Sequence, residues 1–100
     1  MGRRPLTTKG KRVMLEDLNG ANVIVRTVTF IYTGTLETVT SDGFMKLTDA
    51  AWIAETDRWS TTLATGSLRE VEPYPGTCYV ALSSVVDVAP WAHKLPRTAK

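Results

Sequence analysis

The clearest structural pattern in this 100-residue chain lies in residues 19–50, NGANVIVRTVTFIYTGTLETVTSDGFMKLTDA. This segment is rich in β-branched residues and is punctuated by Asn19-Gly20, by a lone Gly34 and by Ser-Asp-Gly at 41–43. Runs of β-branched residues between turn residues favour consecutive, strongly bent antiparallel strands over helices. Because a chain of this length has room for one hydrophobic core, we expect an all-β domain built as a small barrel.

Three strands are predicted in and beside this segment, over residues 22–29, 30–40 and 44–54. Alternate residues of a strand point to opposite faces, so each strand can offer one face to a core. Gly34, inside the second strand, removes a side chain where the sheet bends sharply or where another backbone comes close. The Ser-Asp-Gly turn tolerates the positive φ that a tight connection needs.

The residues on either side of the strands predict two short helices. Residues 12–18 form either a short helix that ends at Asn19-Gly20 or an extended lead-in to the first strand. Thr56 is placed to cap a second helix over residues 57–65, which Gly66 would close.

The last third of the chain returns to strand-forming sequence. Residues 68–72 are expected as a loop with a little strand character, and residues 78–82 and 85–88 as the last two strands. Only Ser83 and Ser84 separate these two strands. A joint of this length is too short for a parallel crossover, so it predicts a tight corner or a hairpin.

Charge is distributed unevenly along the chain, although the net charge is only +2. The first twelve residues carry five bases and no acid, whereas residues 94–100 carry three bases and no acid. We therefore divide the chain into a basic arm (1–11), one barrel domain (12–90) and a C-terminal tail (91–100). The basic ends are interpreted either as flexible, solubilising tails or as arms that contact nucleic-acid phosphates.

Catalytic and metal-binding patterns are not evident in the sequence. His93 is the only histidine and Cys78 the only cysteine, so neither a zinc site nor a catalytic triad can be assembled from them. His93 is expected in an exposed tail, and Cys78 as a small buried apolar group. We expect no enzyme activity, cofactor, metal or small-molecule substrate. Without a signal peptide or membrane span, the protein is expected to be cytoplasmic.

Four short motifs, in this order, resemble those of the Sm-like (Sm/LSm) family. They are Leu18-Asn-Gly20 with Val23-x-Val25, Tyr32-x-Gly34-x-Leu36, Leu47-x-Asp49-Ala50, and Val80-x-Leu82-Ser-Ser-Val85-x-x-Val88. The resemblance covers residues 12–55 and 77–90 and treats residues 55–76 as an insertion between the third and fourth strands. It implies a five-stranded, strongly bent, antiparallel SH3-like barrel with a short N-terminal helix.

The resemblance also implies a homo-oligomeric ring, in which the fourth strand of one subunit pairs with the fifth strand of the next. The sequence supports this independently, because the two strands contain one charged residue, Asp87, and edge strands without charged residues are usually covered or paired. Candidate interface residues are Cys78, Tyr79, Val80, Ala81, Leu82, Val85, Val86 and Val88. The alternative is a monomeric barrel whose edges are covered by its own tails or insertion.

RNA-binding members of the family use the loops that correspond here to residues 40–44 and to Ser83-Ser84. Phe44 stands where they have an asparagine, and the second loop has neither their arginine nor their glycine. The resemblance therefore implies a ring, with a role as an RNA chaperone or in RNA processing, that lacks standard uridine recognition. Candidate contacts to single-stranded RNA are Asp42, Phe44, Lys46, Ser83, Ser84, Arg3 and Arg4.

Two alternatives to this site remain open at the level of sequence. Phe44 is interpreted more readily as part of the barrel core, because phenylalanine is among the most frequently buried residue types. Lys46 is interpreted more readily as a solvated strand lysine. The alternative function is a ring that organises protein partners and binds no nucleic acid.

Overall fold

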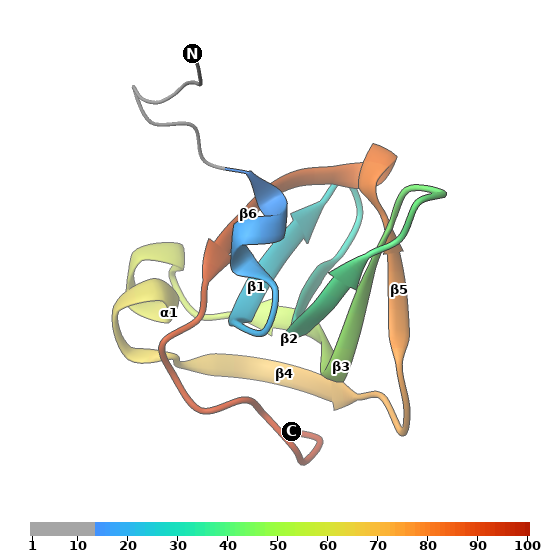
Figure 1. The fold of residues 1–100 in the computed structure, drawn as a ribbon. Helices are drawn as coiled ribbons and strands as arrows, with labels where there is room; N and C mark the ends of the chain where they lie inside the picture. The colour runs from blue at the N-terminus through green and yellow to red at the C-terminus, as the bar shows by residue number, and fades with distance from the viewer. Residues whose placement is uncertain (1–13) are drawn as a thin grey trace.

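The computed structural model describes residues 14–100, so the basic arm with Arg3 and Arg4 lies outside the described residues. Figure 1 shows a strongly bent sheet with short helical segments at its margins. In chain order the elements are η1 (Leu15–Leu18), β1 (Asn22–Thr27), β2 (Ile31–Val39), β3 (Phe44–Thr56), α1 (Trp59–Thr65), β4 (Leu68–Pro73), β5 (Cys78–Ala81), η2 (Leu82–Ser84) and β6 (Val85–Pro90).

All pairings in the sheet are antiparallel, and the strand order is β4-β3-β2-β1-β6, with β5 also paired to β3. The 13-residue β3 pairs with β2 along one edge and with two strands, β5 and β4, along the other. Its first part, from Phe44 to Leu47, pairs with β5, and its later part, from Ala51 to Thr56, pairs with β4. Within residues 14–100 the sheet does not close between β5 and β6. The predicted all-β, bent antiparallel fold with a short N-terminal helix is thus confirmed.

The segment expected as a loop at 68–72 is a sixth strand, which pairs with the end of β3. It forms because two of its own side chains, Leu68 and Val71, are buried. Correspondingly β3 continues to Thr56, beyond the predicted end at residue 54. The chain therefore leaves the sheet between β3 and β4 over residues 57–67, within the segment 55–76 that the resemblance treats as an insertion.

The helical segments are shorter than predicted. The N-terminal one is a single 3₁₀ turn, η1. Helix α1 has Arg58 as its N-cap residue in place of Thr56, because the Arg58 carbonyl oxygen accepts the first hydrogen bond of the helix, from the Thr62 N–H at 2.9 Å. Gly66 ends the helix as expected, with φ of 79°.

Hydrophobic residues are buried on both faces of the sheet. Inside the bend lies a first cluster, with Val23, Val25, Leu36, Met45, Leu47, Ala50, Cys78 and Val80. On the opposite face lies a second cluster, with Ile24, Ala51, Ile53, Leu68, Val71 and Trp91, to which Trp59 of α1 and Leu95 add. Full burial of such a side chain contributes about 1.5–3 kcal/mol. Packing on both faces explains why β1 reads as an uninterrupted apolar run rather than an alternating one.

A β-bulge in β3 produces the bend opposite Gly34. Asp49 has a positive φ of 50°, and the register with β2 shifts between Thr33 and Thr35. A Cβ atom on Gly34 would lie 3.1 Å from the Thr48 carbonyl oxygen and 3.3 Å from the Ala50 Cα. The predicted close backbone approach at Gly34 is therefore present.

We expect Gly34→Ala to lower the free energy of unfolding by about 1–3 kcal/mol, because backbone atoms of β3 would have to move. Urea denaturation followed by circular dichroism measures this loss. Gly76→Ala is the matched control: a Cβ there meets nothing within 4 Å, so its effect should stay within about 1 kcal/mol of zero. Equal losses in the two variants would contradict the close approach.

The C-terminal residues pack against the domain. Trp91 is buried, and the backbone of Lys100 exchanges two hydrogen bonds with Val71 of β4, each 3.1 Å long. His93 is half-buried, with Nε2 2.8 Å from the Leu63 carbonyl oxygen. The expectation of an exposed tail histidine is therefore wrong. We call residues 91–100 the C-terminal strap.

Candidate nucleic-acid interface

The two loops predicted to bind RNA lie next to each other. Residues 40–43 connect β2 to β3, and η2 connects β5 to β6. The backbone N–H of Leu82, at the start of η2, donates to the Gly43 carbonyl oxygen at 2.9 Å. Because β5 also pairs with the start of β3, both loops are fixed at one end of the sheet.

An aromatic hollow of about 280 Å³ opens beside these loops and is lined by Thr40, Asp42, Phe44 and Tyr79. We call it the Phe44 hollow. Phe44 is 36% exposed and Tyr79 is 54% exposed. The interpretation of Phe44 as barrel core is wrong, because Met45 and Leu47 take the inward positions of β3 and alternation turns Phe44 and Lys46 outward.

Lys46 adds positive charge to the same outer face. It lies directly across from Tyr79 in the β3–β5 register, and its Nζ is 3.4 Å from the Glu37 carboxylate. Both side chains of this ion pair are partly exposed, so the pair is weak and can open to a stronger anion. Lys46 is thus available to a phosphate next to the two aromatic rings.

The loop at residues 40–44 is held by its own side chains. The Phe44 backbone N–H donates to Thr40 Oγ1 at 3.0 Å, and the Thr40 hydroxyl donates to the Asp42 carboxylate. Asp42 therefore brings negative charge into the hollow. A carboxylate accepts hydrogen bonds from base amino groups and repels phosphate, so it favours contact with a base over contact with the backbone.

The two serines of the second loop differ. Ser84 donates its hydroxyl to the Ala81 carbonyl oxygen at 2.8 Å, which makes it part of the corner. Ser83 is exposed and has its hydroxyl free of hydrogen bonds to residues 14–100. From the sequence, Tyr79 was predicted only as an interface residue. The alternation along Cys78–Ala81 indicates that Tyr79 faces outward, because it stands between the inward-facing Cys78 and Val80.

Strands β5 and β6 have one free edge each. In the described part of the chain β5 pairs only with β3, and β6 only with β1, so the joint between them is a corner and not a hairpin. Cys78 and Val80 point into the core, and burial raises the pKa of the Cys78 thiol. Tyr79 and Val86 are the exposed side chains. The predicted interface residues therefore offer mainly backbone groups and these two side chains.

Asp87 is the single charged residue on these edges, and it is neutralised from within the subunit. Its carboxylate pairs with the Arg26 guanidinium of β1, its register partner. This hydrogen bond lowers the pKa of Asp87 and raises that of Arg26. Arg26 also lies over the Trp59 ring, 5.0 Å from its centroid. The edge therefore has no net charge to oppose pairing with another strand.

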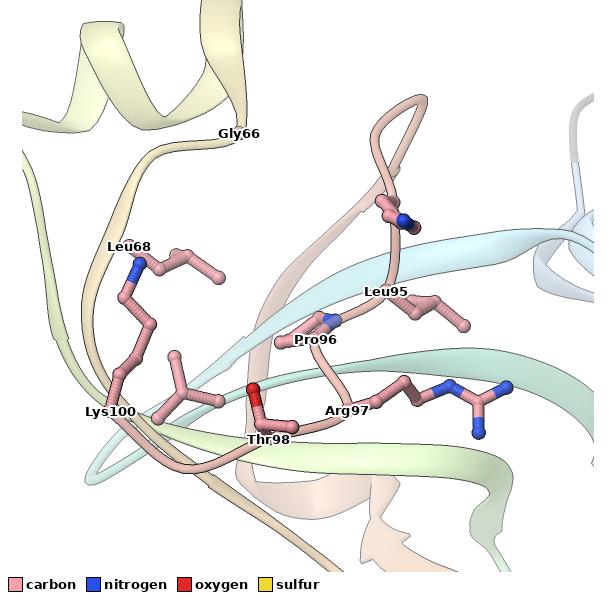
Figure 2. Close-up of a pocket in the computed structure, with 9 residues that line it drawn as sticks. Gly66, Leu68, Leu95, Pro96, Arg97, Thr98 and Lys100 are labelled. Carbon is pink, nitrogen blue, oxygen red and sulfur yellow. The ribbon is translucent and has the colours of Figure 1, made fainter.

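A second hollow, of about 370 Å³, lies between the C-terminal strap and β4 (Figure 2). Its lining combines apolar side chains, among them Leu68, Val71 and Leu95, with the three C-terminal bases, Lys94, Arg97 and Lys100. Arg97 pairs with Asp49 at 3.2 Å. The bases predicted to lie in a tail are thus held against the domain by the strap.

Other functional features are few in the part of the chain that the structure covers. In residues 14–100 no three His, Cys, Asp or Glu side chains gather as metal ligands would. No helix within that range is long and apolar enough to cross a membrane.

Comparison with solved structures identifies the fold. The structure is similar to the SmAP1 heptamer of P. aerophilum, with a TM-score of 0.56 and 22% sequence identity over 76% of this chain and 85% of that chain. It is equally similar to a heptameric archaeal Sm protein, with a TM-score of 0.55 and 22% identity over 76% of this chain and 93% of that chain. Neither a protein-family model nor a curated protein matches the sequence. The chain has an Sm-like fold.

Proposed function

We propose that this protein forms a homo-oligomeric ring in which β5 of one subunit pairs with β6 of the next. The support is that both strands have a free edge without net charge and meet at one corner, where η2 turns the chain. Unpaired edges of this kind are templates for strand addition, and head-to-tail addition that closes after a fixed rotation gives a ring. Both similar structures are heptamers.

We further propose that each subunit binds single-stranded RNA at the Phe44 hollow. The observation that carries this proposal is the exposed aromatic pair, Phe44 and Tyr79, with Lys46 beside it where the two loops meet. Stacking of a base on an aromatic ring contributes about 1–3 kcal/mol and tolerates any base. The hollow lacks the amide and the arginine that recognise the edges of uracil. The site is therefore expected to discriminate only weakly between bases.

Phe44→Ala should weaken RNA binding about 5- to 100-fold, the loss of one stacked base. Fluorescence anisotropy with labelled oligouridine and oligoadenine, at two salt concentrations, measures it. Lys46→Ala should lower affinity for both sequences and flatten the salt dependence by about 0.7 in log–log slope, one phosphate contact on a single strand.

Phe30→Ala is the matched control, because Phe30 is an exposed phenylalanine that does not line the Phe44 hollow. It should leave RNA affinity unchanged. RNA binding that is tight and unaffected by Phe44→Ala and Lys46→Ala would refute this site.

The second candidate function is a ring that organises protein partners and binds no nucleic acid. Asp42 favours it, since a carboxylate in the hollow opposes the approach of phosphate. The salt dependence of binding distinguishes the two functions, because affinity for RNA falls steeply as the salt concentration rises and counterions compete. A ring that binds no RNA even at low salt would exclude the RNA function and leave the protein-organising ring as the remaining candidate.

A further inference from the structure

Four aromatic side chains form a separate hollow of about 180 Å³, which we call the aromatic mouth: Phe30, Tyr32, Trp52 and Tyr74. Phe30 meets Trp52 and Tyr32 edge to face, with ring centroids 5.5 and 6.4 Å apart. Tyr74 completes the group, 6.4 Å from Tyr32. Phe30 and Tyr74 are exposed. The mouth shares no lining residue with the Phe44 hollow.

The strand pairing brings carboxylates beside this mouth. Glu72 is the register partner of Trp52, so both side chains leave the same face of the sheet. Glu55 and Glu70 are directly opposite each other further along the same two strands. Within residues 14–100 none of these three glutamates forms an ion pair, although four other acidic residues do. Like charges placed directly opposite each other across strands are destabilising, which a cation from elsewhere would relieve.

The mouth itself carries no charge that would compete with a cation. Partial burial raises the pKa of both Tyr32 and Tyr74, so their hydroxyl groups stay neutral. The negative faces of aromatic rings attract an ammonium or guanidinium group. A ring-lined hollow next to unpaired carboxylates therefore fits a positive side chain and repels a phosphate.

We propose that the aromatic mouth is a docking site for an arginine- or lysine-bearing peptide segment of a partner protein. One guanidinium or ammonium group enters between Phe30, Trp52 and Tyr74, and Glu72 meets its charge. The neighbouring Glu70 and Glu55 then favour a second base further along the same peptide. The proposal depends neither on the ring nor on RNA binding, because every residue it uses lies outside β5, β6 and the Phe44 hollow.

The test is titration of the full chain with a labelled peptide of alternating glycine and arginine, followed by anisotropy. Phe30→Ala should weaken binding about three- to tenfold, as expected for loss of one cation–π partner. Glu72→Gln should weaken it less and reduce its salt dependence. Phe44→Ala and Glu16→Gln are matched controls elsewhere on the surface and should leave peptide affinity unchanged. Urea denaturation of each variant verifies that the fold is retained.

Three results would overturn the proposal. One is failure of the peptide to bind, or binding that is indifferent to Phe30→Ala and Glu72→Gln. Another is RNA affinity that falls with Phe30→Ala, which would make the mouth a nucleic-acid site. The third is peptide affinity that rises when the five bases within residues 1–12 are changed to glutamine, since the chain's own arm would then be the occupant. If only RNA binding is lost in Phe44→Ala, the peptide-docking proposal is unaffected. Failure of the peptide site can therefore be distinguished from failure of the proposed RNA site.

Discussion

Val86→Lys should convert the assembly into single chains. Val86 is 59% exposed on β6, the free edge that we propose pairs with β5 of the next subunit. A lysine on an edge strand opposes strand addition, because its charge would have to be buried or displaced on pairing. Light scattering coupled to size-exclusion chromatography should report a mass of several chains for the parent protein and about 11.0 kDa for the variant.

Val28→Lys is the control for this experiment. Val28 is 74% exposed in the connection between β1 and β2 and belongs to neither free edge, although its backbone N–H donates to the Ser84 carbonyl oxygen of η2 at 2.9 Å. The substitution adds the same charge, and the particle mass should not change. A parent protein that already runs as a folded single chain, or a Val86→Lys variant that keeps the full mass, would rule out pairing of β5 with β6.

The same variant links assembly to RNA binding. A ring presents several copies of the Phe44 hollow to one strand of RNA, so later contacts form at high effective concentration. Val86→Lys should therefore weaken binding to long RNA while leaving affinity for a very short oligonucleotide nearly unchanged, because the hollow itself is intact.

Trp91→Ala should lower the free energy of unfolding by about 3–5 kcal/mol, the usual cost of removing a buried tryptophan. Trp91 is 4% exposed in the second hydrophobic cluster. Its Nε1–H donates to the Lys94 carbonyl oxygen at 3.3 Å, and the ring meets His93 edge to face. The substitution leaves a cavity and releases the strap, and urea denaturation measures the combined effect.

Two comparisons make the Trp91 result specific. Trp91→Phe should retain most of the stability, because a ring still fills the cluster. Trp59→Ala removes a tryptophan that is only half-buried at the margin of the same cluster, and it should cost less. If Trp91→Ala unfolded at the same urea concentration as the parent protein, residues 91–100 would be a dispensable tail.

Local sequence was sufficient for the strands around Gly34. The β-branched runs, the lone glycine and the Ser-Asp-Gly turn each act within a few residues, so β1, β2 and the start of β3 could be placed in advance. Strand β4 was missed because Leu68 and Val71 are three residues apart, which does not read as strand alternation. They become strand positions only through pairing with the end of β3.

The candidate site was likewise predicted in part from local sequence, and the rest of it depends on tertiary contacts. The alternation of inward and outward positions along β3 already indicated that Phe44 points outward. The frequent burial of phenylalanine in proteins nevertheless favoured a place in the core. That the two loops meet depends on the pairing of β5 with the start of β3 and on the hydrogen bond between Leu82 and Gly43, thirty-nine positions apart. The C-terminal strap likewise needs β4 and α1 in place before Trp91 has a cluster to enter. Short-range periodicity and turn chemistry thus specified the bent strands. The aromatic mouth, the Phe44 hollow and the strap come instead from contacts between segments that are distant in the sequence. Such contacts form only when burial on both faces of the sheet outweighs the loss of conformational entropy on bringing these segments together.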